Sequence, residues 1–573
     1  MLASARLLRT DFTKNDIDLL NSDLNSFQAK YTDFEKSAQG IYWVSIIPYV
    51  SDFKNGVEAG HYLVLAAKEA VTAITPYADL IGFKKGEASF LQKSAQDRLQ
   101  TAVLTLDKVL GNIDSISEDI HQAQIRFDKI DPGRYPGKIG NTLVGERIAN
   151  IKEQFDGIAS LFVNAKPLIK SLPEMLGKNK EKTYLILFQD DKELRATGGF
   201  LTAYGVFTVK DGKISIERSE DIYSLDNSIA VHPTAPSQIL TYHKNVNKFY
   251  IRDSNLSPDL PTSVALFNSL YKNSSEKVKY DGIITIDSQV LVDMLTIFGD
   301  TEADGIIFSA NKTPECNCAQ VLYRLFDLVD RPVNYVKTNR KGILGDLMYA
   351  LFYKAIGFSP TRYWGTLTQQ MFKNLQEKHI LVYFVDPALE DSIKKLNFGG
   401  TINNYSGDYL DVVNVNFAGA KSNLFTTETI TSQATSDNGK ITKNVTVEFR
   451  NPYPQSDCNL ERGGLCLNAP LRNWIRVYVP QGSKLGSFQG SLMPVKTYDE
   501  LGKTVFEGFV IVYPEGKAEV KLSYTLPASI ATNNYSIMLE KQAGTDNQKW
   551  IVSLDGKTLY DNNLDVDEII KAN

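Results

Sequence analysis

The chain has 573 residues, of which 43% are hydrophobic and 23% are charged. This length exceeds that of one ordinary domain, and the composition is typical of globular protein rather than of a disordered chain. The net charge of −5 provides no general basic surface, so nucleic acid is not expected as a partner.

Helical periodicity dominates residues 1–175. A capping pattern, Thr13 followed by Asp16, precedes apolar residues that recur alternately three and four positions apart from Ile17 to Phe34. This spacing fits either a coiled coil or a helix of an intramolecular bundle. Further helices are predicted over 58–74, 88–110, 113–127 and 143–162. Because no catalytic constellation occurs here, the region is interpreted as a helical bundle or stalk.

Strands and helices alternate in residues 176–415. Residues 184–188 are apolar at every position, which predicts a central strand buried on both faces. Asp211-Gly212 predicts a hairpin turn. The segment YDGIITIDSQVLVDMLTIFGD predicts a strand, a cap at Asp287 or Ser288, and a helix. The pattern predicts a central α/β/α domain with its sheet between helical layers.

The periodicity changes to two in residues 416–573. Apolar and polar residues alternate in four segments, 445–449, 475–479, 520–524 and 550–554, and turn signals separate them. This pattern predicts a C-terminal antiparallel β-sandwich. The whole chain is therefore expected to be a multidomain α+β protein.

The four cysteines form two pairs in sequence, Cys316 with Cys318 and Cys458 with Cys466. Two disulfides with three possible pairings, or four free thiols, are all compatible with this count. Cys458 and Cys466 enclose a short glycine-rich loop that a disulfide would span easily in an oxidising compartment. Zinc is not favoured, because no histidine lies near either pair and Cys-x-Cys is not the usual ligand spacing.

Candidate site residues follow the first predicted strand of the central domain. Ligands of open α/β sheets bind beyond the carboxyl ends of the strands, where this chain has Asp190, Asp191 and Arg195. A guanidinium can bind phosphate through two N–H groups, and Gly198-Gly199 would let the backbone approach a ligand closely. The alternative is that Arg195 forms an ion pair with Glu193 or Asp191.

Two further basic motifs extend this prediction. Arg252-Asp253 follows an aromatic run, and Arg340-Lys341 precedes a predicted helix whose first N–H groups favour an anion. Asp190 and Asp191 are candidate ligands for a Mg²⁺ ion bridged to that anion. The alternatives are a structural ion pair and a solvated helix start. The chain has no P-loop, dinucleotide fingerprint or nucleophile elbow, so the corresponding enzyme classes are not supported.

Several motifs carry a resemblance to known proteins: LILFQDDKELRATGGF, YIRDSNLSPDLPTS, YDGIITIDSQVLVDMLTIFGD and NRKGILGDL. They resemble a bacterial envelope family catalogued as a domain of unknown function, and the resemblance continues into the C-terminal sandwich. More remotely, the core resembles the LytR-CpsA-Psr family. That resemblance implies an α/β/α core that binds a polyprenyl-diphosphate-linked glycan and transfers it to a cell-wall polymer, using arginines, Mg²⁺ and an acidic residue.

The resemblance also assigns roles. Arg195, Arg252 and Arg340, with Lys341, would bind the diphosphate, and Asp253 would take the proton of the attacking hydroxyl. Where that family has an aspartate near its first arginine, this chain has Ala-Thr-Gly, so Asp190 or Asp191 would have to replace it as a metal ligand. The lipid would lie in an apolar tunnel lined by three residues of one helix, Val290, Leu291 and Leu295.

The expected location is the extracytoplasmic face of the cell membrane, as part of cell-wall biogenesis. No stretch of the sequence reaches the roughly 18 apolar residues of a membrane span, and residues 1–12 are too short and too charged for a signal peptide. We therefore expect a membrane anchor that is not present in this chain. The alternative expectation is a non-catalytic surface, adhesion or scaffold protein with a degenerate α/β core.

Overall fold

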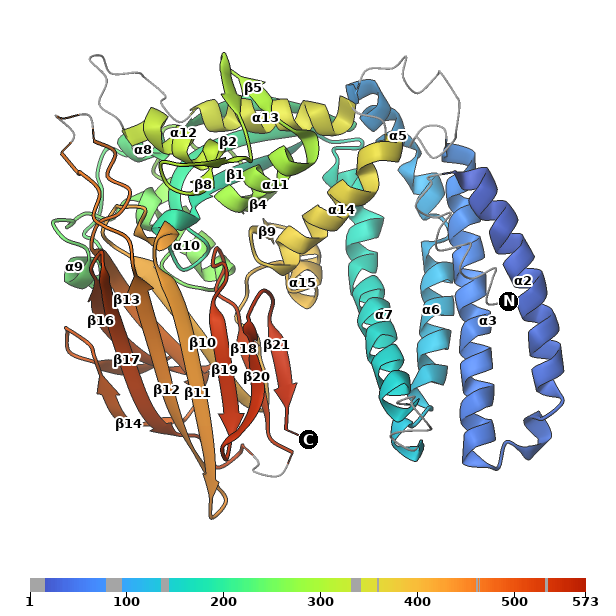
Figure 1. Cartoon of the computed structure of the whole chain (residues 1–573). Coiled ribbons are helices and arrows are strands. Elements are labelled where there is room, and N and C mark those ends of the chain that lie inside the picture. The colour runs from blue at the N-terminus through green and yellow to red at the C-terminus, as the bar shows by residue number, and fades with distance from the viewer. Residues whose placement is uncertain are drawn as a thin grey trace.

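The computed structural model describes residues 16–78, 95–135, 144–330, 342–357, 360–459, 462, 464–530 and 534–572. Figure 1 shows a helical region on the right, a smaller sheet with helices in the upper part, and a β-sandwich at the lower left. The fold is therefore mixed α/β, with an N-terminal helical region and C-terminal strands in sheets. None of the helices among the described residues is long and apolar enough to cross a membrane.

The N-terminal region consists of long helices that pack side by side (Figure 1). Asp16 caps the first of them, because its Oδ1 accepts a hydrogen bond from the N–H of Leu19 at 3.1 Å; Thr13 lies outside the described residues. Ile17 and Leu24 of the predicted seam are buried against Val71, so the seam joins two helices of one chain. The helices are α2 (Ile17–Gln39), α3 (Pro48–Ile74), α5 (Ala95–Leu110), α6 (Ile113–Asp128) and α7 (Val144–Met175).

The central sheet has the strand order β3-β2-β1-β4-β9. Its two middle strands, β1 and β4, are parallel, and the other neighbours pair antiparallel. The predicted hairpin turn at Asp211-Gly212 joins two of the antiparallel strands. The strands are β1 (Lys182–Asp190), β2 (Phe200–Lys210), β3 (Lys213–Asp221), β4 (Gly282–Asp287) and β9 (Ile380–Phe384).

Both faces of β1 are buried, as the apolar run at 184–188 predicts. Leu185 and Leu187 face one core, which also contains Val264 and Phe267. Phe188 faces the opposite core. The helices of the central region are α8 (Ile222–Asn227), α9 (Ser237–Tyr242), α10 (Leu260–Tyr271), α11 (Ser288–Phe298), α12 (Gln320–Asp330), α13 (Gly342–Gly357), α14 (Pro360–Gln376) and α15 (Pro387–Lys395).

The C-terminal region is a sandwich of two six-stranded sheets, with orders β15-β16-β13-β10-β18-β21 and β14-β17-β12-β11-β19-β20. The prediction of a purely antiparallel sandwich is wrong in one respect, because β10 pairs parallel with β18 and β11 pairs parallel with β19. The strands are β10 (Asp408–Asn416), β11 (Thr427–Asp437), β12 (Lys440–Asn451), β13 (Leu471–Pro480), β14 (Lys484–Gln489), β15 (Lys496–Glu500), β16 (Lys503–Val512), β17 (Gly516–Thr525), β18 (Ser536–Glu540), β19 (Lys549–Leu554), β20 (Lys557–Asn563) and β21 (Glu568–Lys571).

Strand β10 crosses the boundary that the sequence suggested at 415/416. Every residue of β10 is buried. Leu410 and Val412 face the interior of the sandwich, whereas Tyr409 and Val413 face the core shared with the central sheet. A strand buried on both faces shows no period of two, so the change in pattern appears only after the sandwich has begun.

Each cysteine forms a disulfide with the cysteine nearest to it in the sequence. Cys316 is bonded to Cys318, and Cys458 is bonded to Cys466. The first disulfide spans the small hairpin of β7 (Lys312–Thr313) and β8 (Cys318–Ala319), directly before α12. The second closes the glycine-rich loop between β12 and β13.

Candidate functional site

A pocket of about 380 Å³ opens where β1 and β4 end. These strands are the two parallel neighbours at the centre of the sheet, and such a position is where open α/β sheets bind ligands. One half of the pocket is charged and the other is apolar. Its polar lining includes Asp190, Glu193, Arg195, His243, Arg252, Asp253, Asp287 and Lys421, and its apolar lining includes Phe188, Ile286, Leu291, Leu322, Leu325, Phe326 and Leu344.

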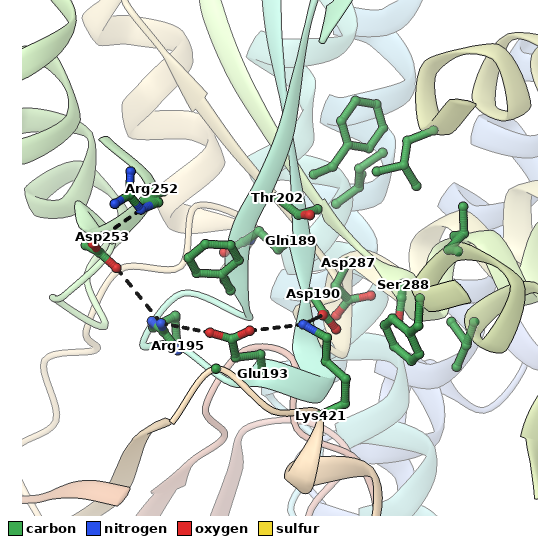
Figure 2. A pocket seen from close by; sticks show the side chains of 18 of the residues that line it. Gln189, Asp190, Glu193, Arg195, Thr202, Arg252, Asp253, Asp287, Ser288 and Lys421 are labelled. Carbon is green, nitrogen blue, oxygen red and sulfur yellow. Dashed lines mark hydrogen bonds and ion pairs between the residues drawn. The ribbon is translucent and has the colours of Figure 1, made fainter. Parts of the chain in front are cut away.

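Lys421, Glu193 and Arg195 form a chain of alternating charges across the pocket (Figure 2). The Nζ of Lys421 lies 2.9 Å from the Oδ2 of Asp190 and 3.0 Å from the Oε2 of Glu193. The other oxygen of Glu193 lies 3.1 Å from the Nη2 of Arg195. Although burial opposes ionisation of Glu193, the adjacent Lys421 and Arg195 hold its pKa below the usual range. Glu193 is therefore an anion held between two cations.

Arg195 is fixed by both the central domain and the sandwich. Its side chain is 1% exposed and lies between the rings of Phe200 and Phe417, 5.2 and 5.4 Å from their centres. One Nη donates to the carbonyl of Asn416 at the end of β10, and the side chain of Gln542 donates to the carbonyl of Arg195. The guanidinium is held in place by rings and backbone before any ligand binds.

The two glycines after Arg195 are required by the backbone itself. Gly198 has φ +130, a conformation that side chains disfavour. A Cβ on Gly199 would lie 2.2 Å from the carbonyl carbon of Asp190. The sequence led us to expect a close approach of the backbone to a ligand at this pair. The close approach in the structure is between Gly199 and the backbone at the end of β1.

Arg252 and Asp253 come from η5 (Ile251–Asp253). They lie next to Arg195, on the side of the pocket away from Lys421 (Figure 2). Arg252 stacks on the ring of Tyr250 at 3.8 Å, and its Nη1 lies 2.6 Å from the Oδ2 of Asp226. The carboxylate of Asp253 lies 3.9 Å from the Nη2 of Arg195 and 4.0 Å from the Nε of Arg252. The structure therefore brings Arg195, Arg252 and Asp253 together.

Asp253 is an unusual carboxylate. It is almost completely buried, and among the described residues its Oδ1 has no hydrogen-bond partner. Burial raises the pKa of Asp253 above its usual range, and burial likewise raises the pKa of Asp190. His243, which also lines the pocket, has its pKa lowered by burial. Burial thus makes the Asp253 carboxylate a stronger base than an exposed aspartate.

The predicted metal ligands Asp190 and Asp191 do not converge. Asp190 faces Lys421, whereas Asp191 accepts hydrogen bonds from the N–H and hydroxyl of Ser288 and pairs with Lys192. Asp190 is the last residue of β1, whereas Asp191 begins the 3-10 turn η4 (Asp191–Glu193), so the chain changes direction between the two side chains. Within the described ranges, no group of three or more His, Cys, Asp and Glu side chains could hold a metal ion. The side chains present therefore do not fit a preformed Mg²⁺ site.

The apolar half of the pocket adjoins a second cavity of about 600 Å³. Phe188 and Ile286 line both cavities and form the wall between them. The second cavity is almost entirely apolar and lies between the sheet and α11, α13 and α14, with Leu99 and Ala102 of α5 completing it. Of the predicted tunnel residues, Val290 lines the second cavity and Leu291 the first. Leu295 belongs to the surrounding core and lines neither cavity.

Some of the predicted residues lie elsewhere, and some residues of the pocket were not predicted. Arg340 and Lys341 lie outside the described residues, directly before α13, whose Leu344 lines the pocket. Lys421 was missed, because no local motif marks a lysine in the loop after β10. The available signal was its position in GDYLDVVNVNFAGAKSN, a segment that shares the family resemblance.

A buried histidine ties the edge of the pocket to the sandwich. The Nδ1 of His379 lies 2.7 Å from the Oδ2 of Asp287, and its Nε2 lies 3.2 Å from the Oδ1 of Asp546. Asp287 also caps α11 through the N–H of Gln289. Although burial opposes the charged ring, the carboxylates of Asp287 and Asp546 raise the pKa of His379 to about 10.

This link predicts a loss of stability at alkaline pH. The folded-state pKa of His379 lies above its unfolded value of about 6.5, so its contribution is fully present below that pH and is lost as the pH rises towards 10. Between those limits, we expect the free energy of unfolding to fall by about 2–4 kcal/mol more in the parent than in His379→Gln. Urea denaturation across this range measures the difference.

The matched control is His121→Gln, at an exposed histidine of α6. It should keep the pH dependence of the parent. Equal slopes for the parent and His379→Gln would show that the buried ring is not charged in the folded protein.

Comparison with known proteins finds one family match. A family described as "Protein of unknown function (DUF4012)" matches residues 179–322, from just before β1 to the start of α12. No curated protein and no solved structure matches the chain significantly. The match includes Arg195, Arg252 and Asp253 but not Lys421 or the sandwich, and it supports the resemblance to a domain of unknown function.

Proposed function

We propose that the central domain binds a polyprenyl-diphosphate-linked glycan at the envelope of a bacterial cell. The diphosphate would lie against Arg195, Arg252 and Lys421, and the lipid chain would follow the apolar wall into the second cavity. The observation that carries the proposal is that the pocket with the cations lies next to about 600 Å³ of apolar space, with Phe188 and Ile286 lining both. This arrangement matches a ligand with an anionic group joined to a hydrocarbon chain.

The cations of the pocket are the feature that an anionic ligand would use. Arg195, Arg252 and Lys421 line it together with four carboxyl groups, and burial raises the pKa values of two of these, Asp190 and Asp253. The preformed orientation of Arg195 would reduce the entropy cost of binding.

Glycan transfer to a cell-wall acceptor is the second part of the proposal. An acceptor hydroxyl would attack the phosphorus that carries the glycan, the lipid phosphate would leave, and Asp253 would take the proton. The raised pKa of Asp253 and its place between two arginines suit this role. The expected Mg²⁺ enters the proposal only as a counterion carried by the diphosphate.

The proposed location is the extracytoplasmic face of the membrane. Two disulfides among the described residues support it, because such bonds persist in oxidising compartments.

Ligand binding tests the first part directly. We expect purified protein to bind geranylgeranyl diphosphate more tightly than it binds pyrophosphate alone or geranylgeraniol alone. Because Arg252 would form charged hydrogen bonds to phosphate, Arg252→Met should weaken diphosphate binding by about 10- to 100-fold. Isothermal titration calorimetry with and without Mg²⁺ measures these affinities.

Arg218→Met is the matched control, since Arg218 lies on the edge strand β3, pairs with Glu276 and does not line the pocket. It should bind like the parent. Failure of the parent to bind the diphosphate would contradict the proposal. That result would favour the alternative, a scaffold protein. The observation that supports this alternative is that Arg195 and Arg252 are already paired within the chain, with Glu193 and Asp226 respectively.

A further inference from the structure

The connector between α2 and α3 exposes an unusual amount of apolar surface. Ile46 is 92% exposed and Trp43 is 84% exposed, and no other stretch of similar length in the described residues gathers as many exposed large apolar side chains. Figure 1 shows this connector at the free lower end of the α2–α3 hairpin, away from the central sheet. The exposed large apolar residues of this end are Ile41, Trp43, Ile46, Ile47, Tyr49 and Phe53.

The connector also lacks charge. Residues 39–51, here called the hairpin tip, have the sequence QGIYWVSIIPYVS, without a charged side chain. The nearest acid that follows, Asp52, is buried and paired with Arg134 at 2.8 Å. An exposed, uncharged and aromatic-rich surface is costly in water and marks a site of contact with an apolar partner.

The tip is ordered by its own hydrogen bonds. The N–H groups of Val44, Ser45 and Ile47 donate to carbonyls three residues earlier, at 2.9–3.2 Å. Pro48, the first residue of α3, has no N–H to satisfy. The hydroxyl of Tyr49 donates to the carbonyl of Arg134 at 3.0 Å, which ties the tip to the neighbouring α6–α7 connector. Internal pairing of backbone donors is what a segment needs to enter a medium without water.

We propose that the hairpin tip inserts into the interface of a lipid bilayer. Trp and Tyr favour the boundary between headgroups and acyl chains, and the isoleucines would reach the acyl region. Because the tip carries no charge, the attachment would depend on apolar burial and would need neither anionic lipids nor low salt. This membrane contact is built into the chain itself, and it is independent of the ligand proposed for the central domain.

The shape of the tip favours a bilayer over a protein partner. The apolar side chains lie on the outer end of two antiparallel helices, a protrusion that a fluid lipid layer can accommodate without a matching cavity. Lys36 and Lys54 stand one turn or so behind the tip on α2 and α3, where long basic side chains can reach phosphate headgroups while the tip is inserted.

A vesicle flotation assay tests the proposal. The full chain should bind neutral phosphatidylcholine vesicles equally well at low and high salt. Because each of the two side chains would lose its apolar burial, Trp43→Ser/Ile46→Ser should reduce the partition coefficient by at least about tenfold. Val231→Ser/Ile307→Ser is the matched control, since these residues are 78% and 60% exposed elsewhere on the molecule, and it should bind like the parent.

Insertion depth gives a second readout. Acyl-brominated lipids should quench Trp43 in the parent, and the quenched component should be absent from Trp43→Ser. The proposal is overturned if the parent does not bind vesicles, if the double variant binds equally well, or if binding disappears at high salt. Concentration-dependent self-association that the double variant abolishes, without vesicle binding, would instead assign the tip to a contact between two copies of the chain.

Discussion

Replacing Arg195 with methionine is expected to lower the free energy of unfolding by about 3–5 kcal/mol, because it removes one of the two cations that hold the buried Glu193 and also the cation that faces the buried Asp253. Arg195 is 1% exposed, and its guanidinium is paired with the buried Glu193. Methionine keeps much of the volume between Phe200 and Phe417 but supplies no charge. Urea denaturation at neutral pH measures the loss.

A second substitution separates stability from binding. In Arg195→Met/Glu193→Gln the carboxylate that lost one of its two cations is also removed, so part of the lost stability should return. Diphosphate binding should stay weak, because the cation is still missing. If the double variant recovers binding together with stability, Arg195 is a structural residue and does not contact the ligand.

Replacing Lys443 with methionine should produce a loss of similar size, about 3–5 kcal/mol, within the sandwich. Its side chain and that of Asp408 are both 0% exposed, and the Nζ lies 2.6 Å from the Oδ2 of Asp408. The hydroxyl of Tyr535 donates to the same oxygen. Removal of the ammonium would leave Asp408 charged inside an apolar core, and thermal or urea denaturation would report the effect.

Lys440→Met is the matched control, since Lys440 is an exposed residue of the same strand. It should change stability by no more than about 0.5 kcal/mol. Lys443→Met/Asp408→Asn should recover part of the loss. A small effect of Lys443→Met alone would mean that the buried pair of Lys443 with Asp408 does not stabilise the sandwich.

The fold was predictable wherever burial leaves a simple pattern. The apolar run at 184–188 gave the central strand, and the aspartate before a helical stripe gave the cap at Asp287. Strand β10 was not predicted, and the boundary at 415/416 falls inside it, because a strand buried against two cores shows neither helical spacing nor a period of two. Its parallel pairing with β18, far along the chain, has no local signal at all.

The candidate site was predictable only where its residues share a short motif. Arg195 and Arg252-Asp253 lie at the ends of recognisable segments, and the structure brings them to one pocket. Lys421 and the link of Asp287 through His379 to Asp546 depend on how distant segments pack, so no spacing rule marks them. Asp190 and Asp191 do not converge on one site, because the strand ends between them and Asp191 turns towards Ser288.

Arg195 is hydrogen-bonded to residues of the sandwich, so a shortened protein would lose part of the pocket. A fragment ending at 415 would keep the arginine but lose the carbonyl of Asn416, the amide of Gln542 and the ammonium of Lys421. Glu193 and Asp190 would then be exposed without the lysine that neutralises them. If such a fragment failed to bind the diphosphate, the truncation itself would explain the failure. Binding assays therefore require a chain that runs through the last strand.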